Sequence, residues 1–178
     1  MRTEIRISGI GGQGVVLAGF ILGKAATVFM DYEAVHSESY GPEARGGYVQ
    51  SEVIISDEKI DYHHALQVDV LALFSEKSWD DQFKNVRKDA KILYDADLIS
   101  KTPPFGVIHK IQAQKIAEEL GNTIIMNIVM VGAITKVLNC LTEDAVRKAV
   151  IDTVPKAYRE LNIKAFDYGL KADSPAFY

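Results

Sequence analysis

Cysteine is nearly absent from this 178-residue sequence, which contains a single one, Cys140. One thiol cannot form a disulfide within the chain, and by itself it cannot hold zinc or an iron–sulfur cluster. Because Leu138 and Leu141 lie beside it, we expect Cys140 to be a buried and unreactive thiol.

Long hydrophobic runs and an excess of basic residues are also lacking. No apolar run approaches the roughly 18 residues of a membrane-spanning helix, and the charged segment Met1 to Arg6 has no signal-peptide core. The 20 basic and 24 acidic residues give a net charge of −4. This charge argues against a nucleic-acid-binding protein, because such a protein neutralises many phosphates. The sequence therefore predicts a cytoplasmic protein that binds neither membranes nor nucleic acids.

What the sequence does contain is the composition of an ordinary globular domain. Its hydrophobic share is 48% and its charged share 25%, and its length is that of about one domain. Strand patterns alternate with helical patterns, and neither a linker nor an internal repeat interrupts them. This alternation predicts an α/β fold, in which residues 1–178 form a single three-layer domain with a mostly parallel sheet and helices on both faces.

The hydrophobic periodicity places the individual elements. We expect strands over residues 3–8, 31–39, 48–56, 68–74, 91–94, 107–111 and 123–126. We expect helices over residues 75–86 and, elsewhere, over 15–29, 113–121, 127–138 and 155–161, with a further helix capped by Thr142. Trp79 is expected to anchor a partner chain, and the aromatic segment 162–178 to become ordered only when docked.

A glycine-rich stretch, Gly9 to Gly14, joins the first expected strand to the first expected helix; we call it the first loop. Glycine suits a backbone with positive φ or a close approach by another chain. The N–H groups at the helix start can hold a negative group. The spacing fits a dinucleotide-binding motif, but Asp31 begins rather than ends the second strand, and no Walker lysine follows Gly14. A tight turn without any ligand and an NAD site both stay open as alternatives.

A second loop, Ser39 to Gly47, has equally unusual backbone demands. A Gly41-Pro42 bend is followed by Arg45 and two glycines, so the arginine guanidinium is expected to lie over backbone that carries no side chains. The planar donors of arginine suit a phosphate, a carboxylate or a partner chain. An ordinary turn with a solvated arginine is the alternative. Because the functional edge of a parallel sheet is the carboxyl end of its strands, we expect the two loops to meet there.

Together the motifs Gly9-Ile10-Gly11-Gly12-Gln13-Gly14-Val15 and Ser39-Tyr40-Gly41-Pro42-Glu43-Ala44-Arg45-Gly46-Gly47 resemble the gamma subunit of the 2-oxoacid:ferredoxin oxidoreductases. Asn127 at the head of an apolar helix, with Gly132-Ala133, is also similar to that family. Ala44 departs from it, because many members carry a longer residue such as Met there. The resemblance covers nearly the whole chain and is greatest to the 2-oxoglutarate members, with the pyruvate and 2-oxoisovalerate members close behind.

The resemblance implies a subunit of an enzyme that oxidatively decarboxylates a 2-oxoacid to an acyl-CoA and passes electrons to ferredoxin. It implies that CoA is a co-substrate and that thiamine diphosphate, Mg²⁺ and [4Fe-4S] clusters are bound by alpha, beta and ferredoxin-like delta subunits. This chain alone would bind no cofactor or metal and would be inactive.

The resemblance assigns no catalytic residue to this chain. It implies that the chain completes the active site and the CoA-contact region, with Arg45 contacting a CoA phosphate or a substrate carboxylate. The residues implied are Gly11, Gly12, Gln13, Gly14, Tyr40, Gly41, Pro42, Arg45, Gly46, Gly47 and Asn127.

Other functions stay open on the residues alone. The turn Gly9 to Gly14 would also serve a stand-alone regulatory module that binds a nucleotide or phosphate. A purely structural subunit without a ligand is a third possibility. His36 and Glu38 share one face of an expected strand, where they form either an acid–base pair, a two-ligand site or simply a polar face.

Overall fold

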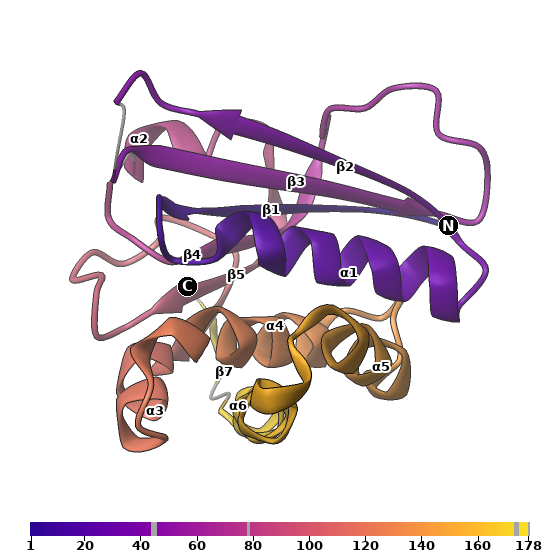
Figure 1. The fold of residues 1–178 in the computed structure, drawn as a ribbon. Coiled ribbons are helices and arrows are strands. Elements are labelled where there is room, and N and C mark those ends of the chain that lie inside the picture. The colour runs from indigo at the N-terminus through magenta and orange to yellow at the C-terminus, as the bar shows by residue number, and fades with distance from the viewer. Residues whose placement is uncertain (44–45, 78, 173–174, 178) are drawn as a thin grey trace.

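A computed structural model describes residues 1–43, 46–77, 79–172 and 175–177 (Figure 1). Its strands form one sheet in the order β2-β3-β1-β4-β5-β6-β7. The strands are β1 (Arg2–Ile10), β2 (Glu33–Tyr40), β3 (Tyr48–Ser56), β4 (Val68–Leu73), β5 (Val86–Asp95), β6 (Val107–Ile111) and β7 (Pro175–Phe177). The helices are α1 (Val15–Phe29), α2 (Trp79–Gln82), α3 (Ala113–Glu119), α4 (Met126–Val137), α5 (Glu143–Thr153) and α6 (Arg159–Lys171).

The centre of the sheet is parallel and its edges are antiparallel. β1, β4, β5 and β6 pair in parallel, whereas β3 runs antiparallel to both β1 and β2, and β7 runs antiparallel to β6. The hairpin β2–β3 is antiparallel because the second loop that joins its strands is too short for a crossover. The predicted α/β class is confirmed, and the parallel strands bring the end of β1 and the end of β4 to the same edge.

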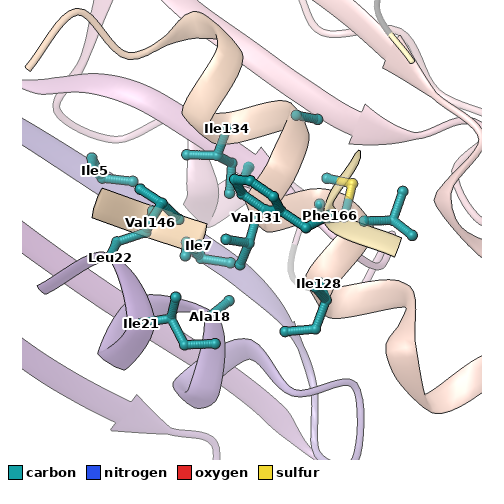
Figure 2. Close-up of a cluster of buried hydrophobic side chains, with 14 of the residues drawn as sticks. Ile5, Ile7, Ala18, Ile21, Leu22, Ile128, Val131, Ile134, Val146 and Phe166 are labelled. Atoms are coloured by element: carbon teal, nitrogen blue, oxygen red, sulfur yellow. The ribbon is translucent and has the colours of Figure 1, made fainter. Parts of the chain in front are cut away.

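The main hydrophobic core lies between one face of the sheet and the helices α1, α3, α4, α5 and α6 (Figure 1). Alternate residues of β1 point into it, so that Ile5 and Ile7 are fully buried. Figure 2 shows these strand residues among side chains from α1, α4, α5 and α6, namely Ala18, Ile21, Leu22, Ile128, Val131, Ile134, Val146 and Phe166.

The opposite face of the sheet has a thinner cover, made of α2 and loops. The helix expected over residues 75–86 is therefore mostly wrong: its helical part is Trp79–Gln82, and β5 already begins at Val86. Trp79 packs edge-on against Phe83, with ring centroids 5.0 Å apart, and lies half-buried against the core of this face. That Trp79 also anchors a partner chain stays a prediction.

Two further expectations are corrected. Residues 123–125 form a 3₁₀ turn that leads into α4 rather than a strand, because the Asn122 side chain accepts a hydrogen bond from the Ile124 N–H and caps the turn. The expected mobile segment is largely helical, since α6 continues to Lys171 with Phe166 fully buried. Residues 173, 174 and 178 of that segment lie outside the described residues.

Candidate functional site

The first loop turns sharply between β1 and α1. Gly12 and Gly14 have φ values of 95° and 71°, a left-handed conformation that favours glycine. Gly14 is the N-cap of α1, no side chain caps this helix end, and its first turn contains no acidic residue. The backbone N–H groups of the first turn of α1 therefore have no side-chain partner from a cap, and they lie at the positive end of the helix dipole. Such an environment suits an anion.

The second loop lies directly against the first. The Gly11 N–H donates a 2.9 Å hydrogen bond to the Gly47 carbonyl. A Cβ added at Gly11 would lie 3.5 Å from the Gly46 nitrogen, so the two backbones are in van der Waals contact. The expectation that the two loops meet at one edge of the sheet is confirmed.

Two amide side chains hold the first loop in place. Gln13 accepts a hydrogen bond from the Ile10 N–H (2.9 Å) and donates one to the Phe74 carbonyl (3.0 Å) at the end of β4. Asn127 is buried at the start of α4 and donates a 3.4 Å hydrogen bond to the Gly14 carbonyl. Both side chains lie at the predicted site, and in this chain they position backbone.

The remaining predicted residues belong to the second loop and its flank. Tyr40 is 65% exposed, and its hydroxyl donates a 2.5 Å hydrogen bond to Glu38, which raises the pKa of Tyr40. Gly41 donates its N–H to the Tyr48 carbonyl (2.7 Å), Pro42 is exposed, and Gly46 has a φ of 61°. Arg45, together with Ala44, lies outside the described residues.

A cleft of about 530 Å³ opens beside the first loop. Its walls are mainly apolar, and Glu38 and Tyr40 form its polar side. The lining residues come from the first loop, α1, β2 and β3: Ile10, Gly11, Gly12, Gly14, Val15, Val16, Leu17, Phe20, Glu38, Tyr40 and Val49. The cleft thus combines an apolar wall with the outward N–H groups of α1.

One residue at this edge was missed by the sequence reasoning. Lys77 follows β4, and its ammonium donates a 3.2 Å hydrogen bond to the Gly46 carbonyl and pairs with Glu43 at 3.2 Å. It therefore ties a third segment to the second loop. The signal that could have found it is its place just after an apolar parallel strand, because such strand ends converge at the functional edge.

The other candidate groups have local partners. His36 Nε2 lies 2.8 Å from the Ser51 hydroxyl, and burial lowers the pKa of His36. Glu38 pairs with Tyr40, so the structure favours a polar strand face over an acid–base pair for His36 and Glu38. The thiol of Cys140 is buried, which raises its pKa.

Metal ligands and membrane spans were also sought in the described part of the chain. There, no group of three or more His, Cys, Asp or Glu residues is placed to hold a metal ion. Within the same residues, no helix is long and apolar enough to span a bilayer.

The family model of pyruvate ferredoxin/flavodoxin oxidoreductases matches residues 4–172 of the sequence. The chain belongs to this family. It is 45% identical over 173 residues to the 2-oxoglutarate synthase subunit KorC of Methanocaldococcus jannaschii, covering 95% of this chain and 92% of that relative. The resemblance to gamma subunits that the two loops indicated is confirmed. The prediction that the chain is a subunit of a 2-oxoacid:ferredoxin oxidoreductase is also confirmed.

Solved structures agree with this family assignment. The keto/oxoacid ferredoxin oxidoreductase gamma subunit from Geobacter sulfurreducens superimposes with a TM-score of 0.88 at 38% identity, covering 98% of this chain and 99% of that chain. The fold also recurs in the 2-oxoglutarate:ferredoxin oxidoreductase from Magnetococcus marinus, solved with 2-oxoglutarate, coenzyme A and succinyl-CoA bound, with a TM-score of 0.83 at 23% identity.

Some family members carry the equivalent of this chain inside a longer polypeptide. The ketoisovalerate oxidoreductase subunit VorA of Methanothermobacter marburgensis is 31% identical over 176 residues, which are 94% of this chain and 36% of VorA. In the Magnetococcus marinus protein the match covers 96% of this chain and 31% of that chain. The fold is therefore used both as a separate chain and as about a third of a longer one.

Proposed function

We propose that this chain is the gamma subunit of a 2-oxoglutarate:ferredoxin oxidoreductase, an assembly that decarboxylates 2-oxoglutarate oxidatively to succinyl-CoA and passes the electrons to ferredoxin. The observation that carries the proposal is the junction of the two loops at Gly11 and Gly47, in a chain 45% identical to a KorC subunit. We further propose that residues 1–178 form one gamma-type domain and that the assembly is cytoplasmic.

The proposed role of this chain is to complete a site that other subunits furnish. The N–H groups of α1 and the apolar cleft would hold an anionic group and an adjoining apolar chain, which are the two chemical parts of CoA. Arg45, which belongs to the second loop in the sequence, is proposed to contact a CoA phosphate or the substrate carboxylate. Gln13, Asn127 and Lys77 would hold the loops in place for that contact.

The chemistry of decarboxylation would be supplied by thiamine diphosphate with Mg²⁺ on the alpha and beta subunits. Electrons would leave through [4Fe-4S] clusters there and on a ferredoxin-like delta subunit. This division agrees with the donor set of the chain, since a single cysteine, Cys140, cannot ligate such a cluster.

The experiment that tests the proposal is a turnover assay of the complex purified with its natural subunits. With CoA and a low-potential acceptor, we expect kcat/KM for 2-oxoglutarate to exceed that for pyruvate or 2-oxoisovalerate by about tenfold or more, because recognition of a second carboxylate discriminates strongly. The isolated chain with thiamine diphosphate, Mg²⁺ and CoA should show no turnover. Preference for another 2-oxoacid would refute the substrate, and micromolar binding of NAD, FAD or ATP to the isolated chain would favour a nucleotide-binding module.

The same assay tests Arg45. Arg45→Ala should raise KM for CoA or for 2-oxoglutarate by about tenfold or more, because a hydrogen bond to a charged group contributes about 1.5–3 kcal/mol. Arg87→Ala is the control, since Arg87 is partly exposed and pairs with Asp69 and Asp89 on β4 and β5. Unchanged Michaelis constants for both substrates in Arg45→Ala would remove the proposed role.

A further inference from the structure

The outward side of α1 is apolar, although none of the residues that the structure describes covers it. Leu17, Phe20 and Val28 are 38%, 47% and 60% exposed. The helix contains one charged residue, Lys24, whose ammonium pairs with Asp152 of α5 at 2.6 Å. A helix on the surface of a soluble protein normally presents charged and polar residues to water, so this side of α1 has the character of an interface.

The apolar side of α1 continues onto the edge strand β2. A second hollow of about 310 Å³ lies between them, lined by Phe20, Gly23, Lys24, Thr27, Val28, Ala34 and His36. It shares Phe20 with the cleft beside the first loop. We call the set Leu17, Phe20, Val28, Ala34 and Tyr40 the α1–β2 face.

Two features make the α1–β2 face suited to a protein partner. Among the described strands, β2 pairs with β3 alone, so its outer edge offers backbone groups that a second chain could use. The polar side chains His36 and Glu38 lie beside the apolar residues, and burial lowers the pKa of His36. An apolar centre with a polar rim is typical of protein–protein interfaces.

We infer that the α1–β2 face docks a separate polypeptide equivalent to the part of VorA that this chain does not match. The inference rests on the proposed function. In VorA the counterpart of this chain is 36% of a longer polypeptide, whereas it makes up 92% of the KorC relative. A relative of the KorC type therefore has no room for the rest of VorA, which is why we assign its equivalent to a separate polypeptide. A second copy of this chain is the less favoured partner. Leu17, Phe20 and Tyr40 also line the cleft, so a second copy bound there would block the other subunits from reaching the cleft.

A substitution at Val28 tests docking without disturbing the cleft beside the first loop. It lines the second hollow and not the cleft, and it lies 14 residues after Gly14 along a helix that rises about 1.5 Å per residue. Val28→Glu therefore places a charge on the α1–β2 face while leaving the two loops untouched. Tyr168→Glu on α6 is the matched control, because Tyr168 is 53% exposed and lies outside the face.

The test measures binding of the full-length chain to the polypeptide from the same organism that aligns with the rest of VorA, by titration calorimetry. We expect Val28→Glu and Phe20→Glu to weaken binding by about tenfold or more, and Tyr168→Glu to leave it unchanged. Thermal melting of each isolated variant checks the fold, and all three should melt within a few degrees of the unmodified chain, because the replaced side chains are exposed.

Each other outcome has a definite meaning. If Val28→Glu and Phe20→Glu bind the partner as tightly as the unmodified chain does, the α1–β2 face is not the docking surface. The proposed function would then remain intact. Failure of the unmodified chain to bind would overturn the proposed function and this inference together. A homodimer of the isolated chain that Val28→Glu abolishes would identify a second copy as the occupant and overturn the assignment of the partner.

Discussion

One of the contacts that fix the conformation of the first loop joins Gly14 and Asn127. A Cβ at Gly14 would lie 2.3 Å from Nδ2 of Asn127, which in turn donates to the Gly14 carbonyl. The neighbouring Gly12 also has positive φ, but a Cβ there would meet nothing within 4 Å. Glycine is thus required at position 14 both by the backbone conformation and by space, and at position 12 by conformation alone.

Gly14→Ala should lower the free energy of unfolding by about 3 kcal/mol, from about 1 kcal/mol of left-handed strain and about 2 kcal/mol of overpacking. Gly12→Ala should cost only about 1 kcal/mol. In an Asn127→Ala background the additional cost of Gly14→Ala should fall to about 2 kcal/mol, because the clashes with Nδ2 and Cγ are gone while Cβ of residue 127 remains 2.9 Å away. Urea denaturation measures all four variants, and equal costs at positions 12 and 14 would contradict this account.

At the scale of elements, the crossing of α4 and α6 brings the two backbones so close that both helices need glycine at the contact. A Cβ at Gly132 would lie 2.3 Å from the Phe166 carbonyl oxygen, and one at Gly169 would lie 2.0 Å from the Val129 carbonyl oxygen. Both obstacles are backbone atoms, so they cannot move without separating the helices. This contact places Phe166 in the main core and keeps α4, which carries Asn127, against the first loop.

Gly169→Ala should therefore lower the free energy of unfolding by about 3 kcal/mol or more, at the upper end of overpacking costs. Gly23→Ala within α1 is the control: its Cβ would lie 3.9 Å from Val53 Cγ1, an ordinary contact. Because alanine is the better helix former, Gly23→Ala should raise the free energy of unfolding by up to about 1 kcal/mol. Chemical denaturation of both variants checks this, and a neutral Gly169→Ala would show that the helices can move apart.

At the scale of the whole molecule, a buried ion pair joins the sheet to the loops on its thinner side. The Arg6 guanidinium contacts Glu52 at 2.8 Å and donates to the carbonyls of Gln82 and Lys84. Glu52 also accepts a hydrogen bond from the Ala65 N–H (3.2 Å). One pair thus connects β1 and β3 to the C-terminal end of α2 and to the loop that contains Ala65.

Arg6→Met should lower the free energy of unfolding by about 3–5 kcal/mol, because it leaves the Glu52 carboxylate buried without its cation. Arg6→Met combined with Glu52→Leu should cost less than Arg6→Met alone, since no charge then remains buried. Lys59→Met, which removes an exposed pair with Asp61, is the control and should change stability by less than about 1 kcal/mol. A double variant less stable than Arg6→Met would contradict this explanation.

Much of the fold could be predicted because its signals are local. The periodicity and the flanking glycine predicted Val15–Phe29 as a helix, and alternation predicted Tyr48–Ser56 as a strand, with the bounds that the structure shows. The N-cap Thr142 accepts from the Ala145 N–H as expected. The errors over 75–86 and 162–178 arose where packing overrides local preference, since Phe83 and Phe166 are held by cores that the local sequence does not contain. The error over 123–126 arose because the local Asn122 cap was not recognised.

By itself the sequence determined the backbone character of the two loops and the family, because glycine spacing and the residues around it are properties of the chain read in order. The tertiary structure decided which groups meet. The Gly11–Gly47 hydrogen bond and the contact of Lys77 with Gly46 join segments that are distant in the chain. Such contacts depend on the order of strands in the sheet, because that order sets which loop ends share an edge and which helix face stays uncovered.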